Sequence, residues 1–150
     1  MTDSLFSLRE LYQEMILDHG RSPRNTGSIS DATHMQEGFN PLCGDKIKIY
    51  LLHENSIIKK IRFEGSGCAI SQASASLMTE ALSGKSADET KVLFDAFHAL
   101  VTTGTPSEQL GKLSVMSGVS EFPARVKCAT LAWHTLMTAL TETEKTEESA

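Results

Sequence analysis

The hydrophobic pattern changes its period at residues 65–68, and this change constrains the fold more than any other feature of the chain. Residues 46–53 and 56–64 alternate polar and apolar side chains around a short turn at Glu54-Asn55, which predicts an antiparallel hairpin. From Cys68 onward the apolar residues recur at helical spacing. Strands that come first and helices that follow predict an α+β fold, in which helices cover one face of a small antiparallel sheet.

Other segments carry start and stop signals for helices and turns. Four helices are expected, at residues 4–19, between Cys68 and Gly84, between the Ser86 capping box and Gly104, and from Pro123 onward. The first helix is interpreted as a loosely docked arm. A short strand is expected at 33–39, and residues 104–120 are expected to form turns and one short helix. In the second strand of the hairpin, strict alternation places four side chains on one side: Ile57, Lys59, Ile61 and Phe63.

The length of 150 residues fits one ordinary domain, which buries roughly 70% of its unfolded surface without needing a disulfide. We therefore predict a single domain at residues 1–140. Residues 141–150 are acidic and poor in apolar side chains, so a frayed or disordered tail is expected there.

The charge and hydropathy of the chain exclude some classes of partner. The formal net charge of −5 argues against binding a phosphate backbone, so no nucleic acid partner is expected. No apolar run approaches the roughly 20 residues that span a bilayer, and the first residues lack the pattern of a secretory signal. We expect a cytoplasmic protein without a membrane partner. In that compartment, three cysteines more often indicate metal binding or catalysis than disulfides.

The three cysteines and one aspartate are the candidate metal ligands. Cys43 and Asp45 flank Gly44, which lets the backbone turn tightly so that both side chains can face one ion. Cys68 lies where the strand pattern gives way to a helix, and Cys128 lies near the start of the last helix. Three thiolates and a carboxylate form a tetrahedral set suited to Zn²⁺.

A second interpretation treats the cysteines as small buried apolar residues and Asp45 as a turn residue. The chain has no C-x-x-C pair, so the local zinc signature is absent. Two details favour the metal: no cysteine occupies a position in the apolar helical stripes, and two cysteines follow or precede glycines in predicted turns.

Basic residues beside Cys128 have a predicted role at the site. Zinc with three thiolates and one carboxylate carries a net charge of −2, which favours a cation nearby. Arg125 precedes Cys128 by three residues on the same helix face, so we expect Arg125 to screen the site; the alternative is a solvated surface arginine. Lys127 is the next neighbour in sequence but points about 100° round the helix.

The five histidines are weaker candidates for metal ligands. His134 should face away from Cys128, and the other four have no partner at metal-ligand spacing: His19, His34, His53 and His98. We interpret them as surface residues or as satisfied residues of the core.

Four segments together resemble a known family: Pro23-Arg24-Asn25 with Gly27, Cys43-Gly44-Asp45, Gly65 to Ser71 with Ser74-Ala75-Ser76, and Arg125 to Ala129. They resemble the IscU/NifU-type iron–sulfur cluster assembly proteins, most of all the SufU branch, over roughly residues 5–140. The resemblance implies a three-stranded antiparallel sheet, the site residues Cys43, Asp45, Cys68 and Cys128, and a cysteine desulfurase of the SufS type as partner.

Two departures from the IscU pattern favour the SufU branch. Lys127 stands where IscU proteins usually have a histidine, and the Leu-Pro-Pro-Val-Lys chaperone motif of IscU is missing from residues 121–127. The segment between Cys68 and Cys128 is also longer than in IscU. The resemblance to SufU implies a zinc protein that takes persulfide sulfur from its desulfurase.

Three functional hypotheses follow. In the first, the protein is the sulfur-transfer partner of a desulfurase rather than a free-standing enzyme, and Cys43 accepts the sulfur because a loop cysteine moves more easily than one at a helix start. In the second, the protein is a scaffold for a transient [2Fe–2S] cluster that passes to apo-proteins. In the third, zinc is structural and the surface only mediates interactions.

Overall fold

The structure is a computed structural model that describes the backbone of residues 2–42 and 44–149 and the side chains of residues 12–42 and 44–141. The elements follow in the order α1 (Thr2–Arg21), β1 (His34–Asn40), β2 (Asp45–Glu54), β3 (Ile57–Ser66), α2 (Ala69–Leu82), α3 (Ala87–Thr103), η1 (Glu108–Glu121) and α4 (Pro123–Ser149). This order confirms the predicted α+β fold.

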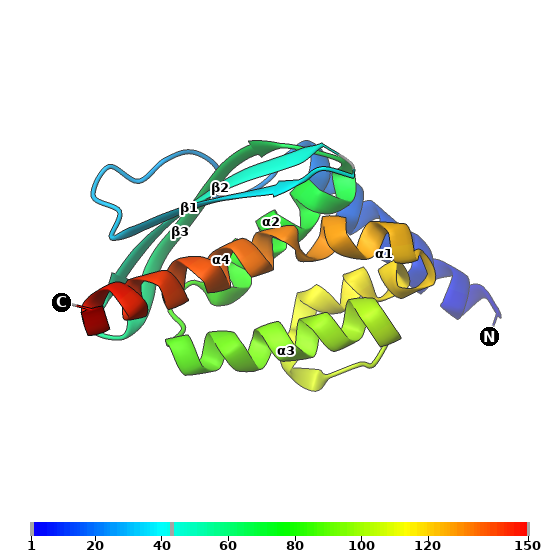
Figure 1. The fold of residues 1–150 in the computed structure, drawn as a ribbon. Coiled ribbons are helices and arrows are strands. Elements are labelled where there is room, and N and C mark those ends of the chain that lie inside the picture. Colours follow the sequence, from blue (N-terminus) through cyan, green and yellow to red (C-terminus); the bar gives the residue numbers. More distant parts are fainter. Residues whose placement is uncertain (1, 43, 150) are drawn as a thin grey trace.

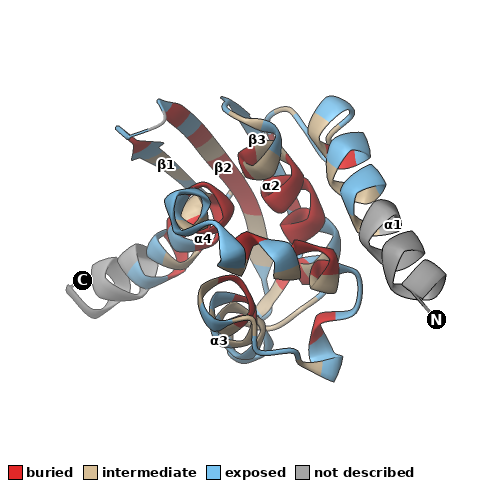
Figure 2. Ribbon diagram, turned by 90° about the vertical axis from the view of Figure 1, so that its right-hand side faces the viewer, coloured by how far each residue is buried: buried red, intermediate tan, exposed pale blue. Residues whose placement is uncertain are grey.

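The three strands form one antiparallel sheet in the order β1-β2-β3. Figure 1 shows the sheet as one layer with the helices gathered beneath it, and Figure 2 shows the same arrangement from the side. Because β1 and β2 pair from His34 opposite Leu51 to Asn40 opposite Asp45, their connection contains only residues 41–44. The three-stranded sheet with helices on one face is therefore confirmed.

A register shift in the hairpin of β2 and β3 corrects the predicted alternation of β3. Leu52 pairs with Lys60, but His53 pairs with Ile58, so Lys59 is an extra residue in its strand. Such a bulge moves the next residue to the other face of the sheet. Ile58 is consequently buried together with Ile61, whereas Lys59 is exposed rather than aligned with Ile61 as strict alternation predicted.

The core lies between the sheet and the helices. Helix α4 packs against β1 and β2, α2 packs against β3, and α3 with η1 forms a further layer below them. Trp133 of α4 is completely buried and stacks on Phe97 of α3, with 4.5 Å between the ring centroids. The predicted capping box at the start of α3 is present: Ser86 accepts from the Glu89 amide, and Glu89 accepts from the Ser86 amide.

The described part of α1 is docked on α2, so the interpretation as a loosely docked arm is wrong. Tyr12, Met15 and Ile16 pack against the core. His19 is only 4% exposed, and its Nδ1 lies 2.7 Å from the hydroxyl of Ser76 on α2. The apolar stripe of α1 thus has a partner surface, which the sequence pattern did not identify.

Two further segments are more helical than the sequence predicts. The segment expected to form turns with one short helix contains the 3-10 helical η1, interrupted at Gly111, where φ is +52°. Helix α4 runs to Ser149, so the backbone of the expected tail is helical in this structure. The single domain at residues 1–140 stays a prediction. Among the described residues, no helix combines the length and the low polarity needed to cross a membrane.

Candidate metal centre

The β1–β2 connection places Asp45 at the end of the sheet. Its turn is closed by the Gly44 amide, which donates to the Asn40 carbonyl at 2.8 Å, and by the Leu42 amide, which donates to the Asn40 side chain at 3.2 Å. Gly44 has a φ of +73°, a conformation that favours glycine, as its predicted role requires. Cys43, the predicted fourth ligand and sulfur acceptor, lies outside the described residues.

Asp45 joins the sheet to the start of α2. Its side chain is fully buried, and its Oδ1 accepts a hydrogen bond of 3.0 Å from the backbone amide of Cys68. Cys68 is the residue that precedes the first turn of α2. A carboxylate is favourable at this position because the first amides of a helix lack partners within the helix.

The other carboxylate oxygen of Asp45 has no hydrogen-bond partner among the described residues, although it is buried. A buried, unpaired carboxylate oxygen is costly, so its presence points to a cation at this place. Asp45, Cys68 and Cys128 each offer one ligand atom, and these atoms all lie within 4.8 Å of one another. The structure therefore brings together three of the four residues that the sequence predicts as ligands.

Cys128 reaches the cluster because α4 lies against α2. Cys128 is almost completely buried, and the next residue, Ala129, accepts a hydrogen bond at its carbonyl from the hydroxyl of Ser74 on α2. Ser74 is itself fully buried. Since Cys68 precedes α2 and Cys128 lies on α4, this bond fixes the relation between the two thiols. Sequence reasoning noted Ser74 as part of a motif but did not assign it this role.

Gly67 is a second residue whose role the sequence does not reveal. A Cβ atom at this position would lie 2.6 Å from Asp45 Oδ1 and 3.1 Å from the Ser71 hydroxyl. Glycine is therefore required for a steric reason, because the backbone just after β3 passes directly over the Asp45 carboxylate. The sequence shows a glycine before Cys68, but it does not show that this glycine leaves room for the Asp45 carboxylate.

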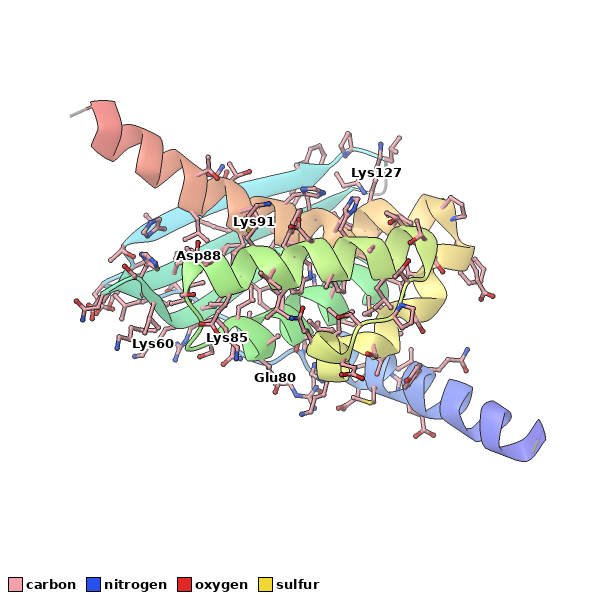
Figure 3. The ribbon with its side chains drawn as sticks, turned by 90° about the horizontal axis from the view of Figure 1, so that it is seen from below. Lys60, Glu80, Lys85, Asp88, Lys91 and Lys127 are labelled. Atoms are coloured by element: carbon pink, nitrogen blue, oxygen red, sulfur yellow. The ribbon has the colours of Figure 1, made fainter. Side chains whose placement is uncertain are left out.

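Arg125 lies beside both described thiols. A hydrogen bond with Cys128, the attraction of Cys68 and then that of Cys128 together raise the pKa of the Arg125 guanidinium above its usual value. The side chain is exposed, so it approaches the cluster from the solvent side. Lys127 is also exposed and projects from the first part of α4 (Figure 3). The predicted screening by Arg125 has geometric support; a role for Lys127 stays a prediction.

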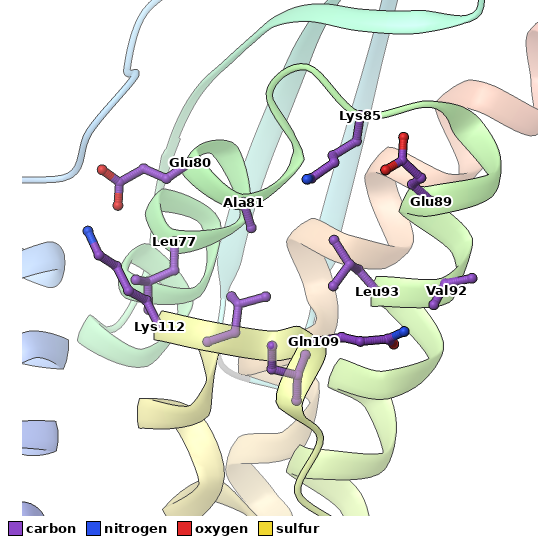
Figure 4. A pocket seen from close by; sticks show the side chains of 11 residues that line it. Leu77, Glu80, Ala81, Lys85, Glu89, Val92, Leu93, Gln109 and Lys112 are labelled. Carbon is purple, nitrogen blue, oxygen red and sulfur yellow. The ribbon is translucent and has the colours of Figure 1, made fainter.

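The donor set fits zinc. Tetrahedral Zn²⁺ binds thiolate, imidazole and carboxylate at about 2.0–2.3 Å, which places ligand atoms about 3.3–3.8 Å apart. The ligand atoms of Asp45, Cys68 and Cys128 lie within 4.8 Å of one another, and Cys43 is only two residues from Asp45 in sequence. A separate pocket of about 820 Å³ lies between α2, α3 and η1 (Figure 4), and its lining residues do not include Asp45, Cys68 or Cys128. Because the metal-binding side chains are at the cluster and not in the pocket, we place the candidate site at Asp45, Cys68 and Cys128, at the end of the sheet.

The fold and the cluster define a small α+β protein with a cysteine-rich metal-binding site. The family model described as the NifU-like N-terminal domain matches residues 11–146, and this chain belongs to that family. The match confirms the resemblance that the cysteine motifs indicate.

Two relatives cover most of the chain. The chain is 39% identical over 132 residues to a protein from Bacillus subtilis named zinc-dependent sulfurtransferase SufU, with 87% of this chain and 89% of that protein covered. It is 43% identical over 131 residues to a protein from Thermotoga maritima named iron–sulfur cluster assembly scaffold protein IscU, with 87% and 92% covered.

Solved structures share the fold. A crystal structure described as an iron–sulfur cluster assembly scaffold for the SUF system, from Fervidobacterium islandicum AW-1, has a TM-score of 0.81 at 35% identity. The alignment covers 85% of this chain and 94% of that one. A NifU-like N-terminal protein from Brucella abortus has a TM-score of 0.82 at 21% identity, with 89% and 94% covered, and supports the fold alone.

Proposed function

We propose that this protein acts in iron–sulfur cluster assembly as a zinc-bound acceptor of persulfide sulfur from a cysteine desulfurase. The observation that carries the proposal is the compact cluster of Asp45, Cys68 and Cys128 with an unpaired, buried carboxylate oxygen. The relative named zinc-dependent sulfurtransferase supports the same assignment. Asp45, Cys68, Cys128 and Cys43 would hold the ion, and bound zinc would keep the thiols as thiolates at neutral pH.

Cys43 is the proposed acceptor of the sulfur. Cys128 is buried within α4, and the amide of Cys68 is bonded to Asp45, so both are anchored. Cys43 instead follows Leu42 in the turn that the sequence predicts, and we propose that a turn cysteine leaves the metal at a lower cost than an anchored one. Its thiolate attacks the terminal sulfur of the desulfurase persulfide. One S–S bond forms on Cys43, the donor S–S bond breaks, and the donor cysteine leaves as a thiolate, so no oxidant or reductant is consumed.

Exposed apolar side chains near the cluster support a docking partner. Leu42, next to Cys43, is 77% exposed, and Phe122, just before α4, is 60% exposed. Phe122 and Arg125 line one groove of 560 Å³ that also includes Ile70 at the start of α2. Large exposed apolar residues around a polar site are typical of a protein interface. We propose that a desulfurase of the SufS type binds here, in the cytoplasm, and that sulfur then passes to a scaffold or to apo-proteins.

A second candidate function is supported by the same site. The relative named IscU is 43% identical to this chain, and a carboxylate among thiolates would make a labile [2Fe–2S] site, suited to a cluster that is released. The metal content of the purified protein separates the two candidates. Zinc near one equivalent supports the sulfur acceptor; iron with acid-labile sulfide supports the scaffold.

The deciding experiment measures alanine production by the cognate desulfurase with and without this protein. We expect stimulation by the zinc-loaded protein and loss of stimulation in Cys43→Ser, while Lys91→Ala, remote on α3, retains it. Mass spectrometry should find the extra sulfur on Cys43. Transfer to Cys43→Ser at the parental rate would refute the acceptor assignment.

A further inference from the structure

The pocket of about 820 Å³ between α2, α3 and η1 has no role in the proposed sulfur transfer (Figure 4). Ligand pockets in proteins commonly have volumes of about 300–1,000 Å³ and mostly apolar walls with a few polar groups. Six of the eleven side chains that line this pocket are apolar: Leu77, Ala81, Val92, Leu93, Leu110 and Leu113. The pocket therefore has the size and the lining of a small-molecule site.

Helix α3 leaves the end of one apolar stripe uncovered where it lines this pocket. The stripe contains Val92, Ala96 and Leu100 at four-residue spacing. Leu100 is buried in the core, Ala96 is half-buried, and Val92 is 49% exposed. The stripe thus continues beyond the part of the helix that the protein itself covers. An apolar molecule in the pocket would remove Val92 from water, which is favourable.

Lys85 supplies a cation at this pocket. Its amide donates to the Leu82 carbonyl at 3.0 Å, and its carbonyl accepts from the Ile58 amide at 2.9 Å, so its backbone is fixed. Figure 4 shows its side chain reaching over the pocket. Lys85 is half-buried, and its ammonium has no ion pair or hydrogen bond among the described residues. A cation that is partly removed from water without a partner favours a bound anion.

The two carboxylates that line the pocket have other partners. Glu89 Oε1 accepts from the Ser86 amide at 3.1 Å, and hydrogen bonds with Ser86 lower the pKa of Glu89, with the attraction of Lys85 as a smaller cause. Glu80 Oε1 lies 3.8 Å from Nε2 of His19, and Figure 4 shows the Glu80 side chain pointing away from the pocket. Neither carboxylate occupies the place beside the Lys85 ammonium.

We propose that this pocket binds a small amphipathic carboxylate, a molecule with an apolar body and one anionic end. The body would lie against Val92 and Leu93, and the anionic end would accept a charge-assisted hydrogen bond from Lys85. Lys112, which also lines the pocket, adds a second positive charge from η1. Because no lining residue is a predicted metal ligand, the proposal does not depend on the proposed function.

The test compares three ligands that share one apolar chain and differ at its end: decanoate, decanol and decylammonium. Each is titrated into the isotope-labelled full-length protein at pH 7.5, where decanoate is ionised, and amide NMR follows the binding. Decanoate should shift the signals of the lining residues Ala81, Leu93 and Leu110 first. It should bind about fivefold more tightly than decanol, and decylammonium should bind more weakly than either.

Substitutions separate the anion contact from the apolar contact. Lys85→Gln should weaken decanoate binding about fivefold and leave decanol binding unchanged. Lys48→Gln is the matched control, because Lys48 is also half-buried but does not line this pocket. Val92→Asp changes an exposed position and should weaken decanoate more than decylammonium. Shifts confined to residues outside the pocket, equal affinity for decanoate and decylammonium, or equal losses in both lysine variants would each overturn the proposal.

Discussion

The two ends of the sheet differ in how they bring polar side chains together. At the thiol end, Asp45, Cys68 and Cys128 come from β2, the start of α2 and α4. At the histidine end, defined by Thr33, His34 and His53, all three residues lie on or beside the paired strands β1 and β2. The first cluster requires helices to be placed correctly against the sheet, whereas the second requires only one strand pairing. Changes in helix placement should therefore affect the thiol end more than the histidine end.

The largest expected effect comes from Gly67→Ala, which should weaken zinc binding at the thiol end and leave the histidine end unchanged. The added methyl group would overlap Asp45 Oδ1, so the carboxylate must move away from the cluster. We expect zinc affinity to fall by at least about tenfold, as when a metal ligand loses its orientation. Competition with a chromophoric chelator measures this change.

Gly118→Ala is the matched control, because a Cβ atom there has no neighbour within 4 Å. It should retain zinc at the parental affinity. If Gly67→Ala bound zinc as tightly as the parent, the proposed position of Asp45 in the site would be wrong.

Much of the thiol end could be predicted from sequence because its residues lie in local patterns. Cys43 and Asp45 flank a glycine, Cys68 marks the change from strand to helix, and Cys128 follows the proline that starts α4. Each pattern reflects the local backbone, and the local backbone can be inferred from neighbouring residues. The described members of the set are brought together as expected.

The remaining features depend on contacts between distant residues. His34 and His53 have no informative spacing, and only the strand register brings them together. The bulge at Lys59 likewise depends on pairing with β2 rather than on the residue itself. The docking of α1 depends on His19 meeting Ser76, a residue 57 positions away. Such partners cannot be deduced from periodicity, which reports which face of an element is buried but not what covers it.

Ser74→Ala should produce the next largest effect and should again separate the two ends. It removes the buried hydrogen bond from Ser74 to the Ala129 carbonyl, at a cost of about 0.5–1.5 kcal/mol in the free energy of unfolding. Because the bond joins the two helices near the two thiols, zinc affinity should fall as well. The ring contact between His34 and His53 at the other end should stay as in the parent.

The control for Ser74→Ala is Thr138→Ala, which removes an exposed hydroxyl bonded to the His134 carbonyl within α4. This variant should change stability little. Urea denaturation, zinc titration and NMR of the histidine rings of both variants measure the effects. Shifted NMR signals of the His34 and His53 rings in Ser74→Ala would show that the two ends are coupled, contrary to the comparison.

Arg125→Ala should cause a smaller change, confined to the thiol end. The guanidinium forms a hydrogen bond with Cys128 and is attracted by Cys68, so its removal takes away the cation that stabilises negative charge developing at these sulfur atoms. Since the side chain is exposed, solvent screens the effect, and we expect alkylation of the zinc-free protein to slow by only about two- to fivefold. Raising the salt concentration should reduce the difference.

Lys127→Ala is the matched control for Arg125→Ala, because it removes a cation from the same turn of α4 on a different side of the helix. It should alkylate at the parental rate. Equal slowing in both variants would assign the effect to the general charge of this surface rather than to Arg125.

The smallest expected effect concerns the response to acid of the helices that support the thiol end. Burial and the positive charge of Arg24 lower the pKa of His19 below its usual value of 6.5, and the nearby carboxylates of Glu80 and Asp18 offset this only in part. Lys112 acts in the same direction as Arg24. His19 is thus neutral in the folded protein, while the unfolded chain binds a proton at higher pH.

Stability must therefore fall as the pH drops through 6.5 toward the lower pKa of folded His19, because the unfolded state binds more protons in this range. His19→Gln keeps a hydrogen-bonding side chain next to Ser76 but cannot titrate, so its stability should fall less between pH 7.5 and pH 5.5.

His134→Gln is a useful comparison, since burial and His98 also lower the pKa of His134. His134 contacts α3 rather than α1, so only His19→Gln should change the acid sensitivity of hydrogen exchange in α1. Parallel loss of stability in the parent and in His19→Gln would show that the contact between α1 and α2 does not sense acid.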